Sequence, residues 1–303
     1  MQSRELSKKD YEVLNFLLKY KMLKVEDATL IYKTKRYYRE RINNLIYKKY
    51  VKRYKSFIVL DKEGRKVLGE TGNNYIKNIK NEPYMERLKN IASIATLSID
   101  SSIKFIPSWE IKEKDKFTET ARRYIGKIVI DNEEFLTYYI SAKKEHIYIK
   151  QLIFDINKSI NFDNIIIFVE DFNVIDKRYS NLALGKDKTL IILNNNKNKE
   201  ILRKYNSIYP YEILERLFDS EILVSDWDKA DYLLEDGIYI LYMPFIDTEK
   251  IEKINWYYEE NSNTKRNINV VTLRQNEQKL KEILNIKCSI KIIDNYIGGK
   301  SEI

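Results

Sequence analysis

The chain has 303 residues, of which 44% are hydrophobic and 33% charged, and its mean hydropathy of −0.50 is typical of a soluble globular protein with an ample core. No stretch approaches the ~18 consecutive apolar residues of a membrane helix, and the first residues lack the apolar segment of a signal peptide, so we expect a cytoplasmic protein. One cysteine and one histidine exclude an internal disulfide and most metal centres, so we expect no cofactor and no metal.

The positive charge is concentrated at the start of the chain. Residues 1–70 hold 19 Lys and Arg against 9 Asp and Glu, a net charge of +10, whereas the remaining 233 residues hold 35 against 36. A lysine-rich composition produced only by AT-rich codons would be spread evenly along the chain. A basic block on one folded segment is instead typical of a protein that binds nucleic acid.

The first predicted helix covers residues 6–20 and begins with clear capping signals. Ser7 is a suitable N-cap, and Asp10, three residues later, can complete a capping box. The apolar face of this helix is formed by Val13, Leu14, Leu17 and Leu18.

Two further helices are predicted, at residues 24–32 and 34–49. Acidic side chains in the first turn of the former suit the helix dipole. In the latter, the inward-facing side chains are Tyr38, Ile42, Leu45 and Ile46. Its opposite face is suited to a major groove, because Arg can bond guanine and Asn can bond adenine there. The predicted DNA contacts of this helix are Lys35, Arg36, Tyr37, Arg39, Asn43, Asn44 and Tyr47.

Two short extended runs follow, residues 50–54 and 57–61, and they predict a β-hairpin that turns at Lys55 and Ser56. Its cations Lys52, Arg53 and Lys55 are suitable partners for DNA phosphates. Three helices followed by a basic hairpin indicate a winged helix-turn-helix domain over residues 1–72. The alternative is a small helical domain with solvated lysines.

Residues 73–100 are predicted to connect this domain to a second one. The helix expected at 83–98 has an apolar stripe that can join domains or pair two protomers, and pairing would favour a homodimer that binds double-stranded DNA. Residues 101–303 alternate between strand and helix patterns, which predicts an α/β domain with a mixed sheet and an α+β fold overall. Strands are expected near 123–131, 134–141, 164–171, 188–195 and 237–245, and helices near 146–160, 197–205, 210–218, 247–261 and 276–285.

Several stretches resemble the replication-relaxation family of plasmid and mobile-element proteins. The matching stretches are residues 6–32, the segment RERINNLIYKKYVKR at 39–53, LDKEGRKVL at 60–68 and SWEIKEKDKF at 108–117. The likeness covers roughly the first 200 residues, and no single motif is diagnostic. It implies a winged helix joined to a restriction-endonuclease-like domain, with the nuclease-like core at 124–160. It also implies a role in replication, its control or transfer.

The sequence departs from that pattern where catalysis would occur. A nuclease of this fold needs carboxylates on two neighbouring strands to hold Mg²⁺ and activate water. Here residues 138–141 read Tyr-Tyr-Ile-Ser where acids are expected, and Lys143 and Lys144 have no acidic partner on the strand. Asp131 and Glu134 border the hairpin turn, at the wrong end of the strands. We therefore expect a degenerate, non-catalytic domain used for dimerisation or for binding a protein partner.

Other polar motifs are weaker candidates. His146 could act as a base, and Asp226, Asp228 and Asp231 could recruit a metal, but a surface histidine and a solvated acidic loop are the commoner interpretations. The sequence thus predicts a DNA-binding protein of the nucleoid or of a plasmid, with a transcriptional regulator and a Mg²⁺-dependent nuclease as the alternatives.

Overall fold

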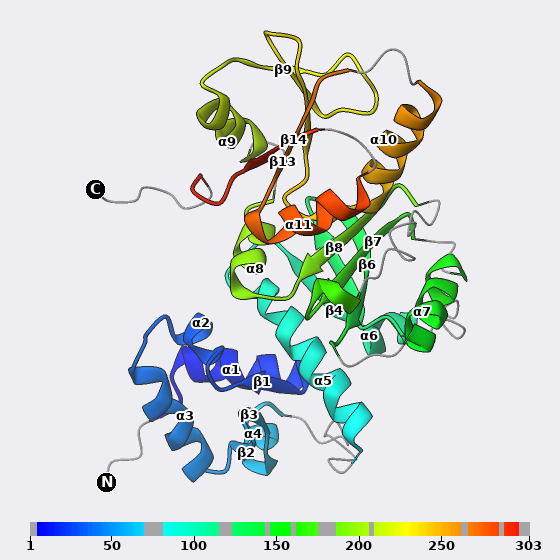
Figure 1. The fold of residues 1–303 in the computed structure, drawn as a ribbon. Helices are drawn as coiled ribbons and strands as arrows, with labels where there is room; N and C mark the ends of the chain where they lie inside the picture. Colours follow the sequence, from blue (N-terminus) through cyan, green and yellow to red (C-terminus); the bar gives the residue numbers. More distant parts are fainter. Residues whose placement is uncertain are drawn as a thin grey trace. The chain divides into compact units, whose positions relative to one another are not determined.

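The computed structural model divides the chain into two compact units, residues 1–114 with 125–127, and residues 115–124 with 128–303 (Figure 1). The expected α+β class is confirmed, because helices with a small antiparallel sheet are followed by mixed sheets with helices. The boundary lies near 114, whereas the sequence had suggested boundaries near 72 and 100. The structure describes residues 5–69, 81–114, 123–142, 146–158, 162–174, 186–205, 209–261, 266–284 and 288–296.

No helix in the described ranges has both the length and the apolar character that crossing a membrane requires.

The first unit combines helices with short strands. The elements of this unit are α1 (Lys8–Tyr20), β1 (Met22–Lys24), α2 (Ala28–Tyr32), α3 (Tyr37–Tyr47), β2 (Val51–Tyr54), β3 (Phe57–Leu60), α4 (Lys62–Val67), α5 (Glu82–Ala95), η1 (Thr96–Ser98), β4 (Lys104–Pro107) and α6 (Ser108–Lys114).

The predicted capping box at the start of α1 is confirmed. The Ser7 hydroxyl accepts a hydrogen bond from the Asp10 backbone N–H at 3.3 Å, and the Ser7 backbone N–H donates to the Asp10 carboxylate at 2.7 Å. The backbone N–H groups of Ser7 and Asp10, which have no partner within the helix, thereby each gain a hydrogen-bond acceptor. Of the predicted apolar face, Val13, Leu14 and Leu17 are buried, whereas Leu18 is half-buried.

The small sheet has the order β1-β3-β2, and its first strand was not predicted. Residues 22–24 pair antiparallel with 57–59, so the predicted helix at 24–32 begins only at Ala28. The reason is the burial of Met22 and Leu23, which contribute to the core through their pairing with β3. The predicted hairpin is confirmed, with β2 and β3 paired antiparallel and the turn at Lys55 and Ser56.

Helix α5 covers this sheet within the first unit. Met85, Leu88 and Ala92 of α5 pack in one cluster with Met22 of β1 and Val59 of β3, and Figure 1 shows α5 running beside β1. The stripe that was expected to connect domains or pair protomers is therefore buried inside its own unit, which makes it unavailable to a second protomer.

The second unit contains two mixed sheets. One includes the neighbouring strands β12-β8-β7-β6-β5, with β6, β7 and β8 parallel, and the other has the order β14-β13-β11-β10-β9. The elements are β5 (Gly126–Ile130), β6 (Glu133–Ile140), α7 (His146–Lys158), β7 (Asn164–Val169), η3 (Phe172–Val174), β8 (Lys188–Leu193), α8 (Asn196–Arg203), α9 (Tyr209–Phe218), β9 (Ile222–Val224), β10 (Tyr232–Leu234), β11 (Tyr239–Tyr242), β12 (Ile246–Asp247), α10 (Thr248–Glu260), β13 (Ile268–Thr272), α11 (Arg274–Ile283) and β14 (Ser289–Ile292).

The long predicted elements of this unit are confirmed, and short strands were missed. Strand β7 is buried along almost its whole length, as expected of a central strand covered on both faces. The predicted hairpin is also present, but its turn lies one residue earlier than the expected pair at 132 and 133. Its turn is formed by Asp131 and Asn132, which both have positive φ, as a two-residue type I′ turn requires. Strands β9, β10, β12, β13 and β14 were not predicted, and neither was β4 of the first unit.

Candidate nucleic-acid interface

Helix α3 is fixed to the first unit by its inward face. Tyr38, Ile42 and Leu45 are buried as predicted, while Ile46 is half-buried. The helix is shorter than the predicted 34–49, since it begins at Tyr37 and ends at Tyr47.

A buried ion pair also holds α3, and the sequence analysis missed it. Arg41 is 5% exposed and donates through its guanidinium to both oxygens of the fully buried Asp10 carboxylate, with Nε to Oδ1 at 3.2 Å. The Tyr32 hydroxyl of α2 donates to the same carboxylate at 2.7 Å, and the Ser7 hydroxyl donates to it at 2.8 Å. One carboxylate on α1 therefore fixes the positions of α2 and α3.

The electrostatics of this cluster favour the ionised carboxylate. Burial alone would raise the pKa of Asp10, but hydrogen bonds from Arg41, Tyr32 and Ser7 together lower it below its ordinary value. Burial and the bond to Asp10 raise the pKa of Tyr32, which stays a neutral donor. The signal in the sequence was the spacing of Arg41, which shares the stripe of Tyr38, Ile42 and Leu45 and so had to face inward.

The outward side of α3 carries the predicted contact residues. Arg39, Asn43 and Tyr47 are exposed on the helix, with Tyr47 82% exposed, whereas Asn44 is half-buried. Tyr37, the first helical residue, is 45% exposed. Lys35 and Arg36 are exposed but precede the helix rather than lie within it, because Arg36 occupies the N-cap position.

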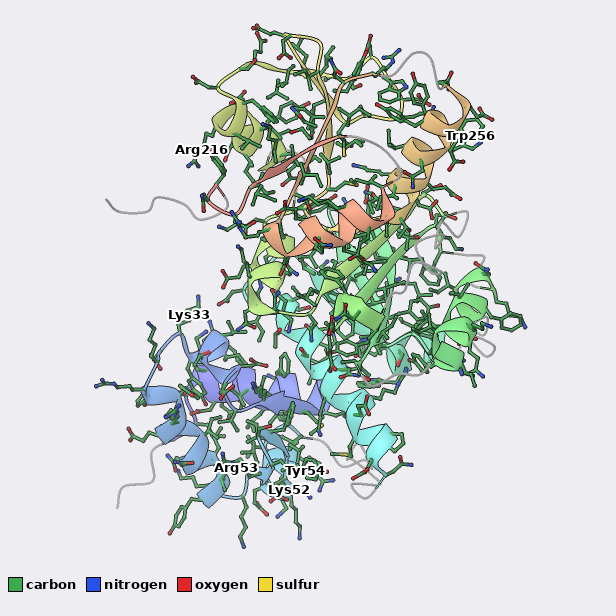
Figure 2. The ribbon with its side chains drawn as sticks, in the orientation of Figure 1. Lys33, Lys52, Arg53, Tyr54, Arg216 and Trp256 are labelled. Carbon is green, nitrogen blue, oxygen red and sulfur yellow. The ribbon has the colours of Figure 1, made fainter. Side chains whose placement is uncertain are left out.

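The hairpin next to α3 presents the other predicted cations. Lys52, Arg53 and Lys55 are all exposed, and Figure 2 shows Lys52 and Arg53 on the hairpin, next to α3. Lys55 has φ of 53°, in the left-handed region that turns of this kind favour. The backbone carbonyl of Ser56 accepts from Val25 N–H at 2.9 Å, which ties the turn to the segment between β1 and α2.

The cations of α3, of the segment before it and of the hairpin differ from other cations of the first unit in their ion pairing. Lys33, which Figure 2 labels apart from the hairpin, is paired with Asp100 at 2.9 Å, and Lys66 is paired with Glu63 at 2.9 Å. No carboxylate in the described ranges forms a salt bridge with the cations that were predicted to contact DNA. These cations are Lys35, Arg36, Arg39, Lys52, Arg53 and Lys55.

A pocket of about 280 Å³ lies where α3 meets the hairpin. Its cationic and amide groups are Arg39, Asn43 and Arg53. The Arg39 Nε donates to the Tyr38 hydroxyl at 2.9 Å, and the Arg53 Nε donates to the Lys55 carbonyl at 3.2 Å. The remaining lining residues are Val25, Glu26, Tyr38, Ile42 and Ser56.

The carboxylates considered for nuclease chemistry do not converge on the end of β6 where acids were expected. Asp131 lies in the β5–β6 turn, and Glu134 is exposed near the start of β6. At the opposite end of that strand, residues 138–141 are buried, and the Tyr139 hydroxyl donates to Glu170 at 3.1 Å. Lys143 and Lys144 lie outside the described residues.

The remaining acidic candidates have structural partners. Asp226 accepts a hydrogen bond from the Tyr239 hydroxyl at 2.8 Å, and Asp231 forms an ion pair with Lys250 at 2.6 Å. His146 is the first residue of α7. Over the described ranges, no group of three or more His, Cys, Asp and Glu side chains could hold a metal ion.

No family model matches this chain, and neither the curated proteins nor the solved structures include a significant match to it. The function is therefore inferred from the geometry and charge of the molecule itself.

Proposed function

We propose that the first unit is a winged helix-turn-helix that binds double-stranded DNA, with α3 in the major groove and the β2–β3 hairpin against the phosphate backbone. The observation that carries this proposal is the set of six exposed cations, unpaired with carboxylates in the described ranges, on α3, on the segment before it and on the adjoining hairpin.

The order of the elements supports the first part of the proposal. Helices α1, α2 and α3 are followed by an antiparallel hairpin, and a segment of four residues, 33–36, joins α2 to α3. A connection of three to four residues between two helices is typical of a helix-turn-helix. The Asp10 carboxylate provides the rigidity that such a motif needs, because it bonds to both Tyr32 of α2 and Arg41 of α3.

The charge supports the second part. A protein that places unpaired cations on one surface gains affinity for DNA by releasing the counterions that surround the phosphates. Carboxylates already neutralise Lys33 and Lys66, so these two contribute less to such a field. Six exposed cations without a salt bridge in the described ranges are therefore available to phosphates on α3, on the segment before it and on the hairpin.

Base reading is assigned to the exposed polar groups of α3. Asn43 can form two hydrogen bonds with an adenine edge, and Arg36 can form two with a guanine edge. The backbone contacts of the hairpin would set the register in which these side chains meet the bases. We accordingly assign sequence preference to α3 and salt-dependent affinity to the hairpin.

The biological process remains the one that the resemblance implies, which is replication of a plasmid or mobile element, its control or transfer. Transcriptional regulation would use the same DNA contacts and is the second candidate. For the second unit we propose a non-catalytic role in dimerisation or partner binding, supported by the separation of Asp131 and Glu134 from the opposite end of β6.

The proposal is tested by selecting bound fragments from a library of random duplexes and then measuring affinity against salt. We expect an enriched motif whose advantage over random DNA is reduced by Asn43→Ala. The pair Lys52→Ala and Lys55→Ala should leave the preferred motif unchanged and lower the slope of log affinity against log salt by about 1.8, which is about 0.9 per phosphate. Lys253→Ala removes an exposed lysine of the second unit and is the charge-matched control.

Two results would contradict the proposal. Duplex binding equally weakened by Lys253→Ala would indicate an attraction that is not localised on the first unit. Strand cleavage with Mg²⁺ that is lost in Asp131→Ala or Glu134→Ala would instead favour the nuclease alternative.

A further inference from the structure

The pocket between α3 and the hairpin is the most informative feature that the proposed function does not use. Its volume of about 280 Å³ lies just below the 300–1,000 Å³ common for pockets that bind small molecules. It therefore suits a single small group. Its lining includes the almost fully buried side chains of Tyr38 and Ile42 beside the polar groups of Arg39, Asn43 and Arg53.

Both arginines of the pocket are held in a way that leaves their binding ends available. Arg39 is fixed through Nε to the Tyr38 hydroxyl and lies near the Tyr38 ring, and Arg53 is fixed through Nε to a hairpin carbonyl. Each guanidinium keeps two terminal nitrogens, which form the planar fork that binds phosphate with two parallel hydrogen bonds. Two such forks, supplied by different elements, line one small space.

Glu26 is the acidic residue of the lining, and it is already partly neutralised. Its carboxylate forms an ion pair with Lys24 at 2.6 Å. Glu26 therefore weakens the positive field of the pocket without cancelling it, and the occupant that the lining favours is a singly charged anion.

The position of the pocket identifies the source of that anion. A helix in the major groove and a hairpin against the adjoining backbone leave one sugar–phosphate strand running through the corner between them. The pocket lies at that corner, because its lining includes both Ser56 of the hairpin turn and Asn43 of α3.

We propose that this pocket holds a single phosphodiester group of the bound DNA, gripped by Arg39 and Arg53 together. The inference rests on the proposed function and reassigns Arg39 from reading bases to positioning the backbone. Asn43, on the same helix face, is left to read the adjacent base edge.

The test is the salt dependence of binding to a short fluorescent duplex of random sequence, measured by anisotropy for Arg39→Ala, Arg53→Ala and the double variant. The slope of log affinity against log salt counts the phosphates that are neutralised, at about 0.9 each. If both arginines grip one phosphate, the double variant lowers the slope by about 0.9 in total. If they neutralise separate phosphates, it lowers the slope by about 1.8, which overturns the proposal.

Two further variants keep this test independent of misfolding. Lys52→Ala, on the same strand but outside the pocket, should lower the slope by about 0.9 in addition to the effect of the double variant. Glu26→Gln should tighten binding roughly two- to fivefold, the range expected when an exposed charge interaction is removed. A gain in affinity cannot result from a damaged fold, and an unchanged or weaker affinity of Glu26→Gln would contradict the proposal.

A competition experiment distinguishes two possible occupants of the pocket, a phosphate of the duplex and a free phosphate ester. Adenosine monophosphate should compete with the duplex only weakly, because one phosphate lacks the neighbouring backbone contacts. Saturable competition that is lost in the double variant would make a free phosphate ester the occupant and overturn the proposal. An unchanged slope in a double variant that still binds DNA refutes the pocket alone, whereas an absence of duplex binding refutes the proposed function as well.

Discussion

Replacing Asp10 with alanine should destabilise the first unit more than any change on its surface. The substitution leaves the Arg41 guanidinium, which is only 5% exposed, without its carboxylate. Removing one partner of a buried ion pair costs about 3–5 kcal/mol, and loss of the capping box adds about 1 kcal/mol. Because whole domains are stable by only about 5–15 kcal/mol, we expect this variant to lose a large share of the stability of the first unit.

Two further substitutions in this ion pair separate the effect of losing a charge from the effect of losing side-chain volume. Asp10→Asn keeps the size of the side chain but removes the negative charge, so it should be less harmful than alanine. Arg41→Met removes the cation and leaves Asp10 with the donors Tyr32 and Ser7, and we expect a smaller loss of about 1–3 kcal/mol. The expected order of stability is wild type, then Arg41→Met, then Asp10→Ala.

The appropriate assay is hydrogen exchange of the backbone amides of α1 and α3 over a denaturant series. A signal from the whole chain would mix the unfolding of two units, which makes a single free energy ill defined. An Asp10→Ala variant within about 0.5 kcal/mol of the wild type would refute the argument, because that is the range of ordinary surface substitutions.

Three further outcomes are expected. Since the folded pKa of Asp10 lies below the ordinary value of 3.8, its stabilising contribution is complete well above that pH. It should be lost as the pH falls through the folded pKa, and acid unfolding of Asp10→Asn should lack this component. Gly64→Ala should weaken the packing of α4 against the hairpin by about 1–3 kcal/mol, because an added Cβ would lie 2.2 Å from the Tyr50 carbonyl oxygen and 2.9 Å from Leu60; hydrogen exchange of the backbone amides of β2 and β3 measures this. Lys55→Gly should preserve or raise stability, because glycine adopts the positive φ of 53° freely. The same variant should lower the slope of log affinity for DNA against log salt by about 0.9. A stable variant with an unchanged slope would exclude Lys55 as a phosphate contact.

Much of the first unit could be predicted because its signals are local. Ser7 and Asp10 indicate the start of α1, and the two short extended runs around Lys55 predict the hairpin. The outward residues of α3 followed from helical spacing, which needs no knowledge of the partner elements. Asn44 was the exception, since its half-buried position depends on what packs beside it.

The features that were missed depend on contacts between distant residues. Strand β1 is three residues long and is defined by its pairing with β3. The role of α5 depends on the sheet that it covers, and its apolar stripe alone could not distinguish that sheet from a second protomer. The pocket brings Glu26, Arg39 and Arg53 together from three segments, so it could not be predicted from any single stretch of the sequence.

The sharpest measurement is residue-resolved NMR of the full chain titrated with a short DNA duplex. We predict that the backbone amide signals that shift belong to residues 35–56, with the largest changes at Asn43 and in the hairpin turn. Shifts confined to the second unit, or spread over both units without a maximum in this segment, would contradict the assignment of DNA binding to α3 and the hairpin.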